Sequence, residues 1–348
     1  MDITHSGGCS ISRINMKVAI LAPVTWRTPP RKYGPWEQVA SVLTEALVKN
    51  GIDVTLFATA DSVTTAKLQS VCERPIGEYP ADAKVWECLH ISHLVEQASE
   101  FDIIHNHFDF LPLTYSRLIR TPVITTIHGF SSEEIIPVYQ KYNANSHYVS
   151  ISNSDRHISL QYIDTVYNGI DEQQFRFESG EGDYLLYFGR IHPHKGAHEA
   201  IQIALQSKKR LILCGLVQDQ HYYKEMVAPF LNDTTIMYQG NVGPVQRNHL
   251  LGNATALLHP ISFEEPFGLS VAEAMLCGTP VIAFARGAMK ELIIDGKTGF
   301  IVHNIAEAVI AVEAVKNIDR QECRQHAMNN FSSQVMAKRY MQLYRQIA

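Results

Sequence analysis

The chain has 348 residues, a formal net charge of −5 and a hydrophobic fraction of 46%. This length predicts two domains or one large domain, and the composition is that of a globular protein without the basic field of a nucleic-acid-binding protein. No apolar run reaches the ~18 residues of a membrane-spanning helix. The six cysteines form no C-x-x-C pair and no zinc spacing, so we expect a cytoplasmic protein with plain thiols.

The chain begins with a polar segment, residues 1–15, that contains glycine and serine but lacks the apolar core of a secretion signal. We therefore expect a loose leader before Met16. Beyond it, short apolar runs alternate with amphipathic segments, which is typical of βαβ units and parallel sheets. Across residues 16–171, strands are predicted at 17–22, 53–58, 102–105, 122–127, 147–151 and 163–166, and helices near 36–50, 86–98, 111–119 and 133–142.

The second half repeats this alternation over residues 184–331. Strands are predicted at 184–188, 210–214, 234–238, 255–258, 280–284 and 299–302, and helices near 196–206, 220–231, 245–252, 268–277, 288–294, 304–317 and 320–330. Residues 172–183 are polar and contain two glycines, so we expect a linker there, and apolar residues at helical spacing predict a helix within 332–348. The sequence thus predicts an α/β protein with two doubly wound parallel sheets, each of domain length.

The strongest functional signal lies at residues 263–275. Glu265 and Glu273 are separated by seven residues, with a Pro-Phe-Gly turn and a predicted helix start between them. Free backbone N–H groups at a helix start favour an anion, and carboxylates accept hydrogen bonds from hydroxyls. A phosphate bonded to a polyhydroxylated group, such as a nucleotide sugar, suits both features. A surface loop with solvated glutamates is the alternative.

A second signal follows the predicted strand at 184–188. The loop that leaves this strand carries Arg190 and Lys195 and ends at a helix start. Strand ends in open parallel sheets bind ligands, and two cations there suit a diphosphate. A solvated loop is the usual alternative for a lone basic pair, but here two complementary sites occur in one half of the chain.

On these residues the chain resembles the family-4 retaining glycosyltransferases of the GT-B fold. Glu265 and Glu273 match that family's E-x7-E motif, and Arg190 and Lys195 match its G-R-x4-K-G loop. Lesser signatures follow in the expected order at 126–129, 151–154, 168–171, 278–282 and 295–300. The resemblance covers nearly the whole chain and implies two facing Rossmann-like domains, with a terminal helix that crosses back onto the first.

The resemblance also implies an activity: transfer of a hexose from a nucleoside-diphosphate sugar to a hydroxyl of a glycan, lipid or small-molecule acceptor, with retention and without a cofactor. Glu273 would hold the ribose hydroxyls and Glu265 the transferred sugar. Arg190 and Lys195 would neutralise the diphosphate, whose negative charge grows as it leaves. The other expected donor contacts are the backbone groups of Gly189, Phe267, Gly268 and Leu269.

Four positions of the first half join this expected site. Gly34 lies in a loop that resembles the family's Gly-Gly loop, although Pro35 replaces the second glycine and, as a helix N1 residue, has a structural explanation. His128 matches the family's T-x-H-G histidine near the transferred sugar; a satisfied histidine at a strand end is the alternative. His107 and Asp109 are candidates for acceptor contact, with a structural role as the equal alternative.

A small basic cluster accompanies the Gly34 loop. Arg27, Arg31 and Lys32 lie beside Trp26 and Trp36, where they would suit a membrane surface or an anionic acceptor, although a solvated loop is the preferred interpretation. Membrane association is thus not indicated by this cluster, and no nucleic-acid partner is expected.

No metal site is expected from the sequence. The histidine pairs at 105/107 and 192/194 lack the carboxylates or cysteines that would complete one. No D-x-D-like motif stands out, and the Arg190/Lys195 pair would replace a divalent cation at the diphosphate. For retention, same-face attack is preferred to a covalent intermediate because no obvious nucleophile accompanies the motifs.

Other functions compete with the transferase. A GT-B epimerase or a pyridoxal-phosphate-dependent phosphorylase is one alternative, and the Glu265/Glu273 pair argues against the epimerase. A non-catalytic nucleotide-binding protein is another, but the donor residues are all present. A Rossmann oxidoreductase is disfavoured because no G-x-G-x-x-G follows the strand at 17–22.

Overall fold

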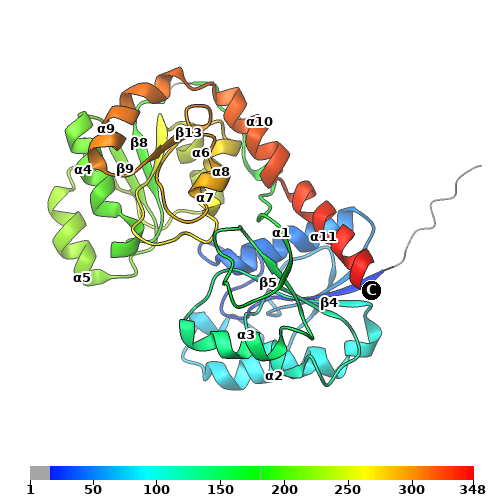
Figure 1. Ribbon diagram of the computed structural model, residues 1–348. Helices are drawn as coiled ribbons and strands as arrows, with labels where there is room; N and C mark the ends of the chain where they lie inside the picture. Colours follow the sequence, from blue (N-terminus) through cyan, green and yellow to red (C-terminus); the bar gives the residue numbers. More distant parts are fainter. Residues whose placement is uncertain (1–15, 181) are drawn as a thin grey trace, which may run out of the picture.

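The computed structural model describes residues 16–180 and 182–348, so the expected leader at 1–15 lies outside the described residues. The described residues form two α/β domains, each with a parallel sheet flanked by helices (Figure 1). This confirms the α/β architecture predicted from the sequence.

The first domain contains a seven-stranded parallel sheet in the order β3-β2-β1-β4-β5-β6-β7. Its strands are β1 (Lys17–Leu21), β2 (Asp53–Phe57), β3 (Lys67–Gln69), β4 (Ile103–Asn106), β5 (Val123–Ile127), β6 (His147–Ser150) and β7 (Tyr162–Thr165), and its helices include α1 (Pro35–Lys49), α2 (Ala83–Glu96) and α3 (Ile136–Tyr142). The inner strands are apolar runs because both faces of the sheet are covered. Strand order reverses between β1 and β4, which opens a crevice at their carboxyl ends.

The second domain contains a six-stranded parallel sheet in the order β10-β9-β8-β11-β12-β13. Its strands are β8 (Leu185–Phe188), β9 (Leu211–Cys214), β10 (Ile236–Tyr238), β11 (Ala256–His259), β12 (Val281–Phe284) and β13 (Gly299–Val302). Its helices are α4 (Ala197–Ser207), α5 (Gln220–Tyr222), α6 (Pro244–Gly252), α7 (Leu269–Leu276), α8 (Met289–Leu292), α9 (Ile305–Ala314) and α10 (Arg320–Phe331). Here strand order reverses between β8 and β11.

The terminal helix α11 (Ser333–Ile347) returns to the first domain and lies beside α1 (Figure 1). Its buried side chains join the core formed by α1, β1 and β2. The two passages of the chain between the domains are adjacent, because Ile170 N donates to Phe331 O (2.8 Å) and Ser333 N donates to Ile170 O (2.8 Å). Two adjacent segments of the chain therefore connect the domains, and this arrangement can act as a hinge.

The segment 172–183, expected as a linker, packs against the second domain where it is described. Phe175 lies in the core of that domain. Glu178 N donates to Cys277 O (3.1 Å), and Arg320 Nε donates to Glu178 O (2.8 Å). The passage between domains therefore lies nearer residue 170 than the polar composition suggests.

Some local predictions were wrong in detail. The helix expected over 111–119 is a short 3-10 segment, Leu111–Tyr115, in which the Thr114 and Ser116 hydroxyls donate to backbone carbonyls and compete with helical bonds. The helix expected over 220–231 breaks into α5, a π turn at Tyr223–Val227 and a 3-10 turn that contains Pro229, which has no N–H to donate. Strand β3 was not predicted.

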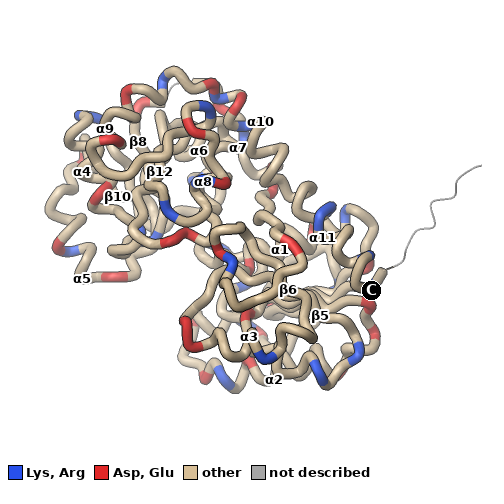
Figure 2. Tube along the Cα trace, viewed as in Figure 1, with Lys and Arg blue, Asp and Glu red and all other residues tan. Residues whose placement is uncertain are grey.

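Acidic and basic residues are interspersed along both domains (Figure 2). Within residues 16–180 and 182–348, no helix is long and apolar enough to cross a bilayer.

Candidate active site

A cleft of about 900 Å³ lies between the domains at the carboxyl ends of both sheets. Its lining follows strands β1, β4 and β5 of the first domain and β8, β9 and β11 of the second. These include the points where strand order reverses, the usual ligand site of open parallel sheets. Every predicted site residue except His107 lines it: Gly34, Asp109, His128, Gly189, Arg190, Lys195, Glu265, Phe267, Gly268, Leu269 and Glu273.

The structure pairs two of the predicted catalytic residues with each other. Lys195 Nζ lies 2.6 Å from Glu265 Oε2, and His259 Nε2 lies 3.4 Å from the same oxygen. Burial raises the pKa of Glu265, but the adjacent His259 and Lys195 outweigh it and lower the pKa to about 2. Glu265 is therefore ionised at neutral pH and holds a cation at the floor of the cleft.

Two glycines give this region its shape. Gly196, which ends the loop of Lys195, has φ 75°, and a Cβ there would lie 2.0 Å from Pro260 O. Gly268, just before α7, has φ 99°, and a Cβ there would lie 2.8 Å from Met289 Cε. Both positions favour glycine because an L side chain is strained at these angles and would collide.

Arg190 extends from the same loop toward the first domain. Its Nη1 donates to Gln218 Oε1, and its guanidinium carbon lies 6.0 Å from the ring centroid of Tyr33. Tyr33 precedes Gly34, so the predicted phosphate loop faces the predicted glycine loop across the cleft. The structure brings these two sequence motifs together from different domains.

Helix α7 begins at the cleft, with Phe267, Gly268 and Leu269 in the lining. The Phe267 side chain packs inward, with ring centroids 6.1 Å from Tyr167 and 5.8 Å from Phe331. The first N–H groups of a helix have no intrahelical partner, so this start is suited to an anion or a hydroxyl.

Glu273 lies inside α7 and pairs with a residue that was not predicted. Arg247 Nη1, from α6, lies 3.2 Å from Glu273 Oε1, and both side chains are almost buried. Burial raises the pKa of Glu273, and Arg247 opposes that shift. The Nε of Arg247 has no hydrogen-bond partner in the described part of the chain, although the residue lines the cleft.

The sequence did contain a signal for Arg247. It precedes the buried Leu250 by three positions and the buried Leu251 by four, so it shares their face of α6. A charged residue on the apolar face of a helix requires a buried partner, and Glu273 supplies it.

The predicted sugar histidine is held by a row of neutral side chains. His128 Nε2 lies 2.9 Å from His107 Nδ1, and the Trp36 ring stacks on His128 at 5.7 Å between centroids. Burial lowers the pKa of His128 to about 3 and that of His107 well below its ordinary value. His107 is fully buried behind His128, which corrects the expectation of acceptor contact, because a ring with no exposed surface cannot touch a ligand.

This row continues to the terminal helix. The His107 ring packs on His105 at 4.2 Å between centroids. His105 Nδ1 lies 2.7 Å from the Tyr344 hydroxyl, and His105 Nε2 lies 2.7 Å from Thr126 Oγ1, which in turn lies 2.6 Å from the Tyr340 hydroxyl. Helix α11 therefore supports the orientation of His128 from behind.

The Gly34 loop opens helix α1 and brings a further carboxylate to the cleft. Pro35 occupies the first turn, as its structural explanation requires. Glu37, two residues later, is 3% exposed and accepts a hydrogen bond from Trp26 N (3.1 Å). Burial raises the pKa of Glu37 to about 7. Glu37 was missed because one glutamate in a first helical turn looks like an ordinary dipole-favoured residue.

Asp109, like His128, belongs to the first-domain lining of the cleft. It adopts φ 78°, which is uncommon for a residue other than glycine. It accepts hydrogen bonds from Tyr139 Oη (2.5 Å) and Ser131 Oγ (3.2 Å), while burial raises its pKa. Strained backbone of this kind concentrates at functional sites.

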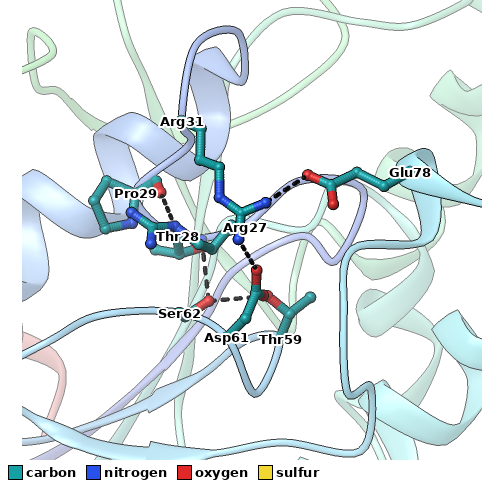
Figure 3. Close-up of polar contacts among 8 residues, drawn as sticks. All are labelled: Arg27, Thr28, Pro29, Arg31, Thr59, Asp61, Ser62 and Glu78. Carbon is teal, nitrogen blue, oxygen red and sulfur yellow. Dashed lines mark hydrogen bonds and ion pairs between the residues drawn. The ribbon is translucent and has the colours of Figure 1, made fainter. Parts of the chain in front are cut away.

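The predicted basic cluster is largely occupied by internal contacts (Figure 3). Arg31 bridges Asp61 (3.2 Å) and Glu78 (3.6 Å), and Arg27 Nε donates to Pro29 O (2.9 Å). These contacts tie the loop after β1 to its neighbours, while Lys32 lines the cleft. Among all the residues that the structure describes, no group of three or more His, Cys, Asp or Glu side chains is arranged to hold a metal ion.

Comparison with known proteins agrees with this geometry. The family described as Glycosyltransferase Family 4 matches residues 37–174, and Glycosyl transferases group 1 matches residues 170–333. An uncharacterised glycosyltransferase of Methanocaldococcus jannaschii is 22% identical over 93% of this chain and 94% of its own. Among solved structures, AviGT4, a glycosyltransferase involved in avilamycin A biosynthesis, is 22% identical with a TM-score of 0.71, over 95% of this chain and 97% of that chain. HepE of Anabaena, in complex with UDP and glucose, is 19% identical with a TM-score of 0.72, over 95% and 99%.

Two facing parallel-sheet domains with a cleft between their strand ends define a protein of the GT-B fold. The two family matches, which together span residues 37–333, identify the chain further: it belongs to the group 1, family 4 glycosyltransferases.

Proposed function

We propose that the protein transfers a hexose, with retention of configuration, from a nucleoside-diphosphate sugar to a hydroxyl acceptor. The observation that carries this proposal is the gathering of Arg190, Lys195, Glu265 and Glu273 around the start of α7, opposite His128. Fixed cations, free helix N–H groups and buried carboxylates together suit a diphosphate joined to two polyhydroxylated rings.

In this proposal, groups of the donor replace contacts that the site residues make with one another. The diphosphate takes Lys195 from Glu265 and also meets Arg190, while Glu265 accepts hydrogen bonds from hydroxyls of the transferred sugar. Glu273 accepts hydrogen bonds from the ribose, and Arg247 favours its ionised form. The neutral His128 forms a hydrogen bond with a sugar hydroxyl. The cations gain most as negative charge develops on the leaving group.

The chemical step we propose is same-face attack. The bond between the anomeric carbon and the leaving phosphate oxygen breaks, and the acceptor oxygen bonds to that carbon on the same face. The departing phosphate takes the acceptor proton. Closure of the cleft would exclude water, which would otherwise hydrolyse the donor.

The test is a thermal-shift screen against common nucleotide sugars, followed by mass analysis of products with candidate acceptors and NMR of the new anomeric linkage. HepE is solved with UDP and glucose, so uridine nucleotides come first. Transfer with inversion would reject the retaining mechanism. Nucleotide binding without any product from a broad acceptor panel would favour the non-catalytic alternative.

We further predict that activity persists in EDTA. Arg190 and Lys195 supply positive charge where other transferases use a divalent cation. Initial rates are compared with and without chelator, and again after magnesium or manganese is added back. Loss of turnover that either metal restores would reject metal independence.

A further inference from the structure

The first-domain side of the cleft differs in chemistry from the donor side. We define the acceptor wall as Trp26, Trp36, Glu37, Glu87, Asp109 and Phe110, all of which line the cleft. Three of these residues are aromatic and three are acidic, and they come from three separate regions of the chain. Aromatic faces and carboxylates on one wall are complementary to a ring with C–H faces and O–H edges.

The carboxylates of this wall have unused acceptor capacity. Trp26 N reaches Glu37 Oε1, but no side chain in the described residues donates to Oε2, which lies above Gly34. Glu87 is half-buried, and no hydrogen bond or ion pair from the described residues reaches its side chain. Burial raises the pKa of both Glu37 and Glu87. Each ionised carboxylate would be stabilised by a donated hydroxyl and destabilised by a second anion.

Positive charge on this wall is scarce. In the described part of the chain, Lys32 is the only Lys or Arg that the first domain contributes to the lining, and it is exposed. Arg27 and Arg31 are engaged by Pro29, Asp61 and Glu78 (Figure 3). A phosphate on the acceptor would therefore meet three carboxylates and one solvated lysine. A wholly apolar acceptor would leave Glu87 and the Oε2 of Glu37 without side-chain donors.

Resting on the proposed transferase function, we infer that the acceptor wall binds a neutral polyhydroxylated ring, the terminal sugar of an uncharged glycoside, and excludes phosphorylated acceptors. The ring stacks its C–H face on Trp26, Trp36 or Phe110 and donates hydroxyl hydrogens to Glu37, Glu87 and Asp109. This assigns the chemical class of the acceptor.

The test uses the full chain with the nucleoside diphosphate that gives the largest thermal shift. Binding of neutral methyl glycosides of glucose, galactose and mannose is compared by saturation-transfer NMR with binding of their 6-phosphates. We expect the best neutral glycoside to bind at least about tenfold more tightly than its 6-phosphate. Glu87→Gln should weaken binding of the neutral glycoside and reduce the difference in affinity between it and its 6-phosphate. Glu100→Gln, an exposed matched control, should change neither affinity.

Tighter or equal binding of a 6-phosphate, or no preference for any neutral glycoside, would overturn the inference. Donor binding and slow donor hydrolysis, measured without acceptor, report on the proposed function separately. A protein that binds and hydrolyses donor but prefers phosphorylated acceptors retains the first proposal and loses this one.

Discussion

The two walls of the cleft hold their ionisable groups in opposite ways. The second domain buries ion pairs, with Lys195 2.6 Å from Glu265 and Arg247 3.2 Å from Glu273. The first domain buries groups that burial drives toward their neutral forms, including His128 and Glu37. Fixed charges suit a leaving diphosphate, whereas neutral hydrogen-bonding groups suit sugar hydroxyls. Under the proposed function, each wall would therefore serve a different part of the transfer.

The largest expected effect comes from breaking a buried pair of the second domain. Arg247→Met would leave Glu273 buried without its counter-charge and should destabilise the protein by about 3–5 kcal/mol. Chemical unfolding followed by circular dichroism measures the change. The Arg247→Met/Glu273→Leu double variant should recover much of the loss because it removes both charges. If the single variant is as stable as the parent, the pair has no structural role.

The next effect concerns turnover. Lys195→Ala and Arg190→Ala should each lower kcat about 10²–10³-fold while raising the donor KM less, because leaving-group charge is greatest at the transition state. Steady-state kinetics with the identified donor measures both constants. Lys209→Ala, an exposed lysine on the same domain, is the control. An increase in KM with kcat unchanged would mean that the two cations bind the diphosphate without assisting its departure.

The two walls also differ in how much of their structure could be predicted from the sequence. Strands such as β1 and β8 were predicted because buried parallel strands are continuous apolar runs. Lys195 and Glu265 were assigned to one site because the G-R-x4-K-G loop and the E-x7-E motif both match the donor site of the family that the chain resembles. Their direct pairing was not predicted, because it depends on how two loops 70 residues apart are folded against each other. His107 was misplaced for a similar reason, since it packs on His105, which contacts Tyr340 and Tyr344 of α11, far along the chain.

The third expected effect is a difference between the two domains in how their stability depends on pH. The folded pKa of His128 is about 3 and that of His90 about 4, both below the ordinary value of 6.5. As pH falls below 6.5, the unfolded chain takes up protons that these buried histidines do not, which lowers stability toward pH 4. Glu37 and Asp155, whose folded pKa values are about 7, oppose part of this decline because they bind protons first in the folded state. Glu265 of the second domain, with a folded pKa of about 2, loses its contribution only below about pH 4.5.

This order can be measured by following each domain separately. All three tryptophans (Trp26, Trp36 and Trp86) lie in the first domain, so fluorescence-detected melting reports on that domain. Between pH 7.5 and 5 we expect its melting temperature to fall, with a smaller dependence in a His128→Asn variant. Hydrogen exchange should show the second-domain strands still protected at pH 5. Simultaneous loss of both domains would contradict the comparison.

The smallest expected effect concerns the contact that holds the walls together. Glu291 of α8 accepts hydrogen bonds from Asn153 N (2.8 Å), Ser154 N (2.8 Å) and Tyr167 Oη (3.0 Å), and so bridges the two domains. Glu291→Ala should shift the cleft toward open forms by roughly 1 kcal/mol, because the contact is partly solvated. The variant should therefore raise the donor KM about fivefold with little change in kcat.

The paired passages at residues 170 and 332 would serve as the hinge. Small-angle scattering should show a larger radius of gyration for the variant without donor, and convergence with the parent protein when donor is saturating. If both proteins give the same profile with and without donor, the cleft is preformed and Glu291 does not control its closure.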